Sequence, residues 1–378
     1  MKKIVTIGEL GIIITGNTPP RSNPILYGNY TPFIKATDIS ETEKYTYHPE
    51  EYYSEEGYNK YIKSLIPKGS TCVVTIGSIG KKMTMAHCDL FINQAMNAII
   101  PNENFDNEYV YYAVKNILPN IKMLDSGTAS GRENVSKSAF SKMQILIEDN
   151  IITQRRIAEI LSRYDSLIEN YQKQIKLLEE SAQRLYKEWF VDLRFPGHEN
   201  TKIVDGVPEG WEKTCLKEVS HILTGKKDAN FGDVGGEYLF FTCAKEPIRA
   251  SSYSFDCDAV ILAGNGDFNV KLYRGKFEAY QRTYVFSPFN SINLFLLFYS
   301  VNSSMQQLFM GASGSTIKFL TKQMLEQISI LLPSSKIATQ FYEVCDRNQK
   351  KVEILKRQID ILTEARDRLL PKLMNGEI

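Results

Sequence analysis

The chain has 378 residues, of which 43% are hydrophobic and 24% are charged, and its formal net charge at pH 7 is +1. This composition excludes a disordered or fibrous chain, and the near-neutral charge excludes a polycation that coats nucleic acid without regard to its sequence. At roughly 100 to 200 residues per domain, the length predicts two or three domains.

The N-terminal residues are expected to form a strand rather than a signal peptide, because Glu9 interrupts their apolar run and no small-residue cleavage site follows. The longest apolar stretch, residues 292–301, is interrupted by Asn293 and Ser300 and is shorter than the roughly 18 to 20 residues that a membrane span needs. We therefore expect no membrane partner. Six cysteines without a Cys-x-x-Cys pair indicate free thiols in a cytoplasmic protein.

The same order of features occurs twice, about 185 residues apart. It consists of an apolar stretch ending in Thr-Gly, a strand-like run closed by two glycines, a strand-like run from Gln to Pro, a helical segment, a Gly/Ser loop and a short strand. In the two halves these features occupy residues 8–16 and 217–225, 73–80 and 260–266, 94–101 and 281–288, 109–117 and 293–305, 127–131 and 311–315, and 145–147 and 330–332. Two homologous α/β modules are the simplest interpretation.

A long amphipathic helix is predicted after each module, from Thr153 to Trp189 and from Lys336 to about Leu370. At about 1.5 Å per residue, each helix would be roughly 50 Å long. The apolar positions chosen for a paired coiled coil are Ile157, Ile160, Tyr164, Leu167, Tyr171, Leu178 and Leu185 in the first helix, and Val352, Leu355, Ile359, Leu362 and Leu369 in the second. The alternative is that each helix packs back on its own module. The predicted domains are residues 1–147, 148–197, 198–332 and 333–378.

Enzyme motifs are missing from the sequence. The segment Gly77–Lys82 does not have the spacing of a nucleotide-binding phosphate loop, and the four histidines, His48, His87, His198 and His221, stand in no metalloprotease or hydrolase motif. We therefore predict no catalytic residue and no metal site.

Basic stretches with aromatic residues between them occur at corresponding places in both modules, which is typical of a surface that contacts phosphates and base edges. Any one of these charges alone is more often an ordinary surface residue. Arg and Gln suit bidentate contacts to guanine and adenine, although Gln94 and Gln281 could equally be buried structural residues. The candidate DNA-binding residues are Arg21, Lys81, Lys82, Gln94, Arg132, Lys226, Lys227, Lys271, Arg274, Lys276, Gln281, Arg282 and Lys318.

The closing segment, residues 362–378 (LTEARDRLLPKLMNGEI), resembles the C-terminal signature of the specificity subunits of type I restriction-modification systems. Residues 154–161 (QRRIAEIL) and 185–197 (LYKEWFVDLRFPG) are similar to the central conserved region of that family, and residues 77–81 and 208–211 also match. The resemblance covers essentially the whole chain. Residues 264–267 (GNGD) depart from the GSIGK form found in the first module.

The resemblance implies an α+β fold in which two α/β target recognition domains alternate with two long helices that pair as an antiparallel coiled coil. Each domain would read one half of a bipartite double-stranded DNA target, and the helices would set the half-site spacing. The implied partners are two methyltransferase subunits, which hold S-adenosylmethionine, and restriction/translocase subunits, which use ATP and Mg²⁺. The chain itself would hold no cofactor and would be non-catalytic. The alternative is a coiled-coil scaffold whose α/β modules bind proteins rather than DNA.

Overall fold

The computed structural model describes residues 2–125, 133–266, 268–312 and 318–378. The chain divides into two compact units, of which unit 1 contains Met1–Lys173 and Leu355–Ile378 and unit 2 contains Gln174–Ile354. Each of the two long helices contributes residues to both units. In the described part of the chain, no helix is long and apolar enough to cross a membrane.

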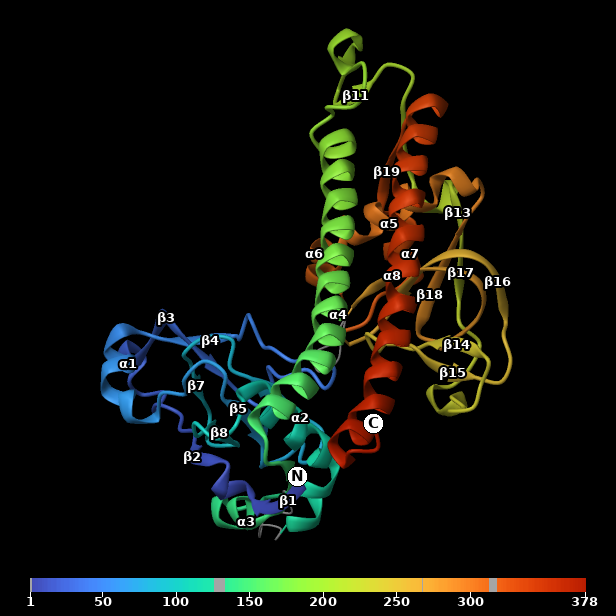
Figure 1. Cartoon of the computed structure of the whole chain (residues 1–378). Helices are drawn as coiled ribbons and strands as arrows, with labels where there is room; N and C mark the ends of the chain where they lie inside the picture. The colour runs from blue at the N-terminus through green and yellow to red at the C-terminus, as the bar shows by residue number, and fades with distance from the viewer. Residues whose placement is uncertain (1, 126–132, 267, 313–317) are drawn as a thin grey trace. The chain divides into compact units, whose positions relative to one another are not determined.

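The sheets of unit 1 are small and mainly antiparallel (Figure 1). A two-stranded sheet pairs β1 (Lys2–Thr6) with β9 (Gln144–Glu148). The four-stranded sheet has the order β2 (Gly11–Thr15), β8 (Met96–Pro101), β5 (Thr71–Val74) and β6 (Met83–Met85). The three-stranded sheet has the order β4 (Glu51–Tyr53), β3 (Tyr27–Ile34) and β7 (Phe91–Ile92), and its β3–β7 pair is parallel. The predicted N-terminal strand is confirmed as β1.

Helix α2 (Asn107–Ile117) forms the centre of the largest core of unit 1. Asp106 caps its N-terminus by accepting a hydrogen bond from the Tyr109 backbone N–H at 3.0 Å, and every residue from Tyr109 to Val114 is buried. The same unit contains α1 (Glu55–Tyr61) and α3 (Lys137–Lys142), the first part of α4 (Ile151–Tyr186) and the last part of α8 (Ser335–Asn375).

Unit 2 is built on one six-stranded sheet. Its strand order is β13 (Ser220–Thr224), β18 (Thr283–Pro288), β16 (Phe255–Ala263), β17 (Val270–Ala279), β14 (Tyr238–Phe241) and β15 (Ile248–Ala250), with only the β14–β17 pair parallel. Two-stranded sheets join β10 (Ile203–Val204) to β11 (Val207–Pro208) and β12 (Glu212–Cys215) to β19 (Ser329–Leu332). The helices are α5 (Leu294–Ser303), α6 (Met305–Gly311) and α7 (Lys322–Glu326). The apolar stretch at residues 292–301 lies mostly in α5, where residues 294–297 and 299–301 are buried.

Within each unit, α4 and α8 run antiparallel to each other. In unit 1, Asp165 of α4 pairs with Arg366 of α8, and Leu161 and Leu370 lie in one core. In unit 2, Tyr186 of α4 contacts Phe341 of α8, with ring centroids 6.4 Å apart. As the position on α4 rises, the position of its partner on α8 falls, so the predicted antiparallel pairing is confirmed. Each helix also packs on a module, because both helices contribute to the module cores.

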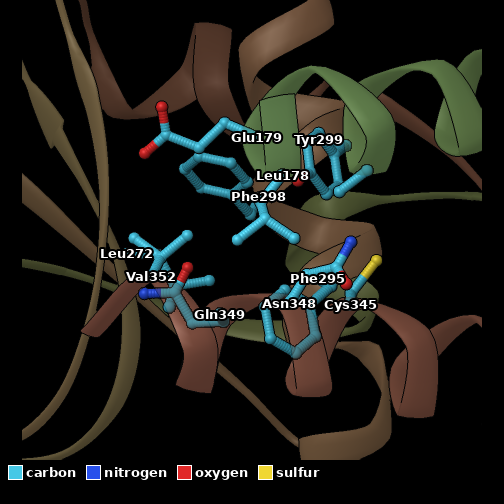
Figure 2. A pocket seen from close by; sticks show the side chains of 11 residues that line it. Leu178, Glu179, Leu272, Phe295, Phe298, Tyr299, Cys345, Asn348, Gln349 and Val352 are labelled. Carbon is cyan, nitrogen blue, oxygen red and sulfur yellow. The ribbon is translucent and has the colours of Figure 1, made fainter. Parts of the chain in front are cut away.

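The contact surface between α4 and α8, here called the seam, is closely filled in unit 2 (Figure 2). Leu178 of α4, Phe295 of α5, Leu272 of β17 and Val352 of α8 meet around a cavity of only about 20 Å³. Such a volume accommodates about one water molecule. The seam is therefore a packing surface and not a ligand site.

One predicted seam residue lies outside the seam. Leu167 is 44% exposed, whereas the next residue, Ile168, is 5% exposed. The buried stripe follows Ile157, Leu161, Asp165 and Ile168, with steps of four, four and three residues, so a polar residue occupies a seam position. Of the other chosen positions, Ile157, Val352 and Leu355 are buried, and Ile160, Tyr164, Tyr171, Leu178, Leu185, Ile359, Leu362 and Leu369 are half-buried.

The ends of the long helices differ slightly from those predicted. α4 gives way to a π-helical turn at Lys187–Val191, and α8 continues through Pro371 to Asn375. Pro371 is exposed, so its ring lies on the outside of the helix. The predicted Gly/Ser loop at 127–131, and residues 313–315 of its counterpart, lie outside the described residues.

Candidate nucleic-acid interface

The two modules share one construction at the edge where the Gln-containing turn precedes β8 or β18. We call the first of these edges corner 1 (residues 15–17, 75–77, 93–96 and 133–135) and the second corner 2 (residues 224–226, 264–266, 280–283 and 318–320). In corner 1, the Gly77 N–H donates to Glu133 O at 3.1 Å, and in corner 2 the Gly266 N–H donates to Lys318 O at 3.1 Å. The two glycine turns therefore contact their neighbouring segments in the same way.

Three further pairs of backbone hydrogen bonds match between the corners. Each N–H donor and its acceptor occupy the same place in both modules, at distances that agree within 0.1 Å. They are Gly16 to Met96 (3.1 Å) and Gly225 to Thr283 (3.0 Å), Thr75 to Ala95 (2.8 Å) and Gly264 to Arg282 (2.9 Å), and Val135 to Thr75 (2.9 Å) and Leu320 to Gly264 (2.8 Å). The internal duplication predicted from the sequence is thus present in the hydrogen bonding.

Glycine is required where the Thr-Gly sequences enter the corners. A Cβ atom added to Gly16 would lie 2.2 Å from Ile92 O, and one added to Gly225 would lie 2.2 Å from Ala279 O. Real Cβ atoms do not approach a carbonyl oxygen so closely, so any other residue would push the turn away. This close approach explains why Thr-Gly was the first repeated signal in the sequence.

The side chains at matched positions carry different charges in the two corners. Corner 1 has Asn17, Ala95 and Glu133, whereas corner 2 has Lys226, Arg282 and Lys318 at the same places. At these positions corner 2 has three cations and corner 1 has one anion. The expectation that basic residues occupy corresponding loops does not hold here, because Glu133 is the counterpart of Lys318. Arg132 lies outside the described residues.

The two glutamines are exposed at the turns, so the alternative that they are buried structural residues is wrong. Gln281 donates through Nε2 to Asp228 Oδ1 at 2.8 Å, and Gln94 accepts a hydrogen bond from the Thr18 hydroxyl. Each side chain is held on the surface by one local partner. Among the described residues, the Gln94 amide nitrogen and the Gln281 amide oxygen have no hydrogen-bond partner, so each can contact a base edge.

Corner 2 contains a cleft of about 330 Å³, lined by Gly264, Gln281, Arg282, Tyr284, Phe319 and Leu320. Arg282 is exposed, and Phe319 is 40% exposed. Within the described part of the chain, the Arg282 guanidinium has no hydrogen-bond or ion-pair partner. Its five N–H donors are therefore available to a ligand in the cleft.

Unlike Arg282, Arg274 is mostly buried and forms an ion pair. Its Nη1 lies 2.6 Å from Asp346 Oδ1 on α8, and the centre of its guanidinium lies 5.1 Å from the centroid of the Phe295 ring. Although burial opposes it, hydrogen bonds from Lys350 and Arg274 hold the pKa of Asp346 below its usual value. Arg274 is only 21% exposed and joins the sheet to α8. No signal in the sequence indicated its pairing with an acid on a distant helix.

The lysines predicted in module 2 remain at or near the surface. Lys276 and Lys227 are stacked over aromatic rings, at 4.9 Å from the centroid of Tyr253 and 4.4 Å from that of Phe231. Lys318 lies 3.8 Å from the centroid of Phe309. Lys271 is half-buried, its Nζ donates to Ala244 O at 2.8 Å, and burial lowers its pKa.

In module 1 the predicted cations are scattered. Arg21 pairs with Glu51 at 2.7 Å and lies over the Tyr27 ring at 4.8 Å. Lys81 is exposed and Lys82 is half-buried after the Gly77–Gly80 turn. Neither Arg21 nor the two lysines belongs to corner 1.

Sequence reasoning missed a buried charged cluster in unit 1. Asp165 of α4 accepts hydrogen bonds from Arg366 of α8 and from the Tyr112 hydroxyl of α2, and Lys44 pairs with Glu108 close by. Burial and the nearby charge of Arg366 lower the pKa of Lys115 to about 8. The polar residues at seam positions were the available signal, but only the fold identifies their partners.

The family model described as the type I restriction modification DNA specificity domain matches residues 2–180 and 208–370, and the chain belongs to this family. The two matched segments each contain one of the α/β modules, so the protein is a type I specificity subunit with two recognition domains.

The chain is 39% identical over 176 residues to the EcoDI specificity subunit of Escherichia coli, a match that covers 46% of this chain and 39% of the relative. It is 25% identical over 412 aligned residues to the MjaIX specificity subunit of Methanocaldococcus jannaschii, covering 100% of this chain and 93% of the relative. Among solved structures, the type I restriction-modification S subunit from M. genitalium superposes with a TM-score of 0.62 at 17% identity, covering 99% of this chain and 96% of that one. This likeness supports the fold.

Proposed function

We propose that this chain provides DNA sequence recognition to a type I restriction-modification complex, with each module reading one half of a bipartite target. The observation that carries the proposal is the pair of corners, which have the same backbone construction and different side chains. A repeated scaffold with altered surface residues is suited to reading two unlike half-sites with one chain.

The proposed contacts follow from the accessibility of the candidate residues. Lysine ammonium groups near the surface are suited to phosphates, whereas Arg282 and the two glutamines are suited to base edges. The proposed phosphate-contacting residues are Arg21, Lys81, Lys82, Lys226, Lys227, Lys271, Lys276 and Lys318. Arg132 is retained as a candidate from the sequence, and Arg274 is not.

The two long helices are proposed to set the distance between half-sites. α4 has 36 residues and α8 has 41, and each contributes to both units. An α-helix has a fixed rise of about 1.5 Å per residue, so its length translates into base-pair spacing. The duplicated chain offers similar surfaces to two copies of a partner, which we propose are two methyltransferase subunits.

In this proposal the other subunits perform the chemistry. The methyltransferase subunits hold S-adenosylmethionine, and restriction/translocase subunits, where they join the complex, use ATP and Mg²⁺. This chain supplies recognition and assembly, holds no cofactor and acts in the cytoplasm. The proposed domains are residues 1–147 and 198–332 for recognition, and residues 148–197 and 333–378 for the helices.

Modified-base sequencing tests the proposal. The genome is compared between cells with and without this chain while the methyltransferase subunit is retained. We expect a two-part methylated motif with a fixed gap to disappear with the chain. Unchanged methylation, together with a lack of sequence-specific DNA binding that weakens with salt, would instead support a protein-binding scaffold.

Exchange of one module tests whether the two modules read their half-sites independently. Residues 1–147 are replaced by the corresponding module of a relative, and the methylated motif is read again. One half-site should change and the other should persist. A simultaneous change in both half-sites contradicts independent reading by the modules.

A further inference from the structure

We infer that Arg282 determines the specificity of the second module by reading a G·C base pair, and that the first module lacks this contact. The inference rests on the proposed function and assigns one side chain to it. The matched hydrogen bonds place Arg282 of corner 2 and Ala95 of corner 1 at the same position of the shared construction.

The state of the Arg282 side chain supports the assignment. It is exposed, it borders the cleft of about 330 Å³, and within the described residues its guanidinium has no hydrogen-bond or ion-pair partner. Arginines that stabilise a fold are usually paired, as Arg274 is with Asp346 at 2.6 Å in the same module. Arg282 therefore contributes little to the fold and has its full set of donors available.

The surroundings of Arg282 are those of a base-reading site. Lys226 and Lys318 occupy the other two charged positions of corner 2 and are suited to the phosphates on either side of a groove. Gln281 is held beside Arg282 by Asp228, and Phe319 supplies an apolar wall. A guanidinium between such groups makes two parallel hydrogen bonds to guanine O6 and N7, which no other base offers in that arrangement.

Among the described residues, corner 1 offers no guanidinium for the same readout. Ala95 has no donor, and Glu133 replaces the cation at the position of Lys318. Glu133 is already paired with Lys122 at 2.7 Å, and a carboxylate at this place repels phosphate. The two half-sites are thus distinguished at this position by the presence or absence of one guanidinium.

The test uses the full-length chain with its methyltransferase subunit in cells, and modified-base sequencing as the measurement. The variants are Arg282→Ala, Arg282→Lys and, as a matched control, Arg249→Ala. Arg249 is an exposed arginine on β15 of the same module, it donates through Nη1 to Glu237 O at 3.0 Å, and it lies outside corner 2. The wild-type chain is measured first, because absence of any methylated motif would overturn the proposed function itself.

With Arg282→Ala, we expect one G·C position in one half-site to become degenerate, with discrimination there falling about 10- to 100-fold, while the other half-site stays unchanged. Arg282→Lys should relax the same position, because an ammonium lacks the planar fork. Arg249→Ala should retain the full motif.

Two results would overturn the inference while leaving the proposed function intact. One is an unchanged motif with unchanged methylation in Arg282→Ala. The other is weaker methylation of a motif whose sequence is unchanged, which would indicate that Arg282 contacts a phosphate and not a base. The thermal stability of the purified complex serves as the folding control and should match that of the wild type.

Discussion

Arg366 of α8 and Asp165 of α4 form a hydrogen-bonded ion pair at 2.5 Å, with side chains only 4% and 8% exposed. The two residues are 201 positions apart in the chain. The Tyr112 hydroxyl donates a second hydrogen bond to the Asp165 carboxylate. This pair joins both long helices to the first module. Because a buried charge without its partner is very unfavourable, loss of either residue should destabilise this contact between the helices.

Replacing either residue by alanine should destabilise unit 1. We expect Asp165→Ala or Arg366→Ala to lower the free energy of unfolding by about 3 to 5 kcal/mol, whereas Arg163→Ala, which breaks an exposed pair with Glu159, should cost about 0.5 kcal/mol or less. Hydrogen exchange along α4 and α8 is the measurement. Both tryptophans, Trp189 and Trp211, lie in unit 2 and would not report on it directly. Equal effects of the buried and exposed variants would contradict the prediction.

Gln154 and Gln340 each follow a threonine near the start of α4 and α8, and they should differ in importance for stability. Gln154 is fully buried. Its side chain donates a hydrogen bond to Glu148 O at 2.8 Å and accepts one from the Asp106 N–H at 2.9 Å. In contrast, Gln340 Oε1 has no hydrogen-bond partner among the described residues. Gln154→Ala should cost about 1 to 3 kcal/mol, since it leaves buried backbone groups unsatisfied. Gln340→Ala is the control and should cost less in the same thermal unfolding experiment. A larger loss for Gln340→Ala would refute this assignment.

Lys115 should make stability depend on pH. Its pKa in the folded protein is about 8, below the value of about 10.4 for an unfolded lysine, so the unfolded chain binds more protons between these values. The contribution of Lys115 therefore becomes more favourable as pH rises from about 8 to 10. Chemical unfolding of the wild type and Lys115→Met at several pH values measures it. The variant should be more stable at pH 7, and the difference should shrink with rising pH. A constant difference would contradict the prediction.

Burial should protect two cysteines from alkylation. Burial raises the pKa of Cys72 and that of Cys345 to about 12, so almost no thiolate is present at pH 8. Iodoacetamide followed by mass spectrometry should modify half-buried Cys215 and Cys243 before Cys72 and Cys345 in the native protein. In urea all four should react alike, which is the control. Early native modification of Cys345 would show that the helix seam of unit 2 opens.

Shortening both helices together should change the gap between half-sites. Removing residues 167–173 and 358–364, which face each other in antiparallel register in unit 1, shortens the pair by about 10 Å, or roughly three base pairs of DNA. Modified-base sequencing should find a changed gap or no methylation. Intact methylation with the original gap would contradict the role of the helices as a spacer.

The periodicity and the repeats in the sequence predicted much of the fold, because both arise from local rules. The apolar spacing identified α4 and α8 to within a few residues at most ends, and the Thr-Gly pairs marked a real close approach. Arg274 and Leu167 show where such rules stop. Arg274 is paired with Asp346, 72 residues away, and Leu167 is exposed because the buried face of α4 runs through Asp165 and Ile168. Both outcomes depend on contacts between distant segments.

The two units differ in whether they are formed from one continuous segment of the chain. Unit 2 is one uninterrupted stretch, Gln174–Ile354, whereas unit 1 needs Leu355–Ile378 in addition to Met1–Lys173. Lys2 of β1 even donates through Nζ to Leu373 O at 3.0 Å. The packing of unit 1 therefore cannot be completed until residues 355–378 have been synthesised, although residues 2–173 precede unit 2 in the chain.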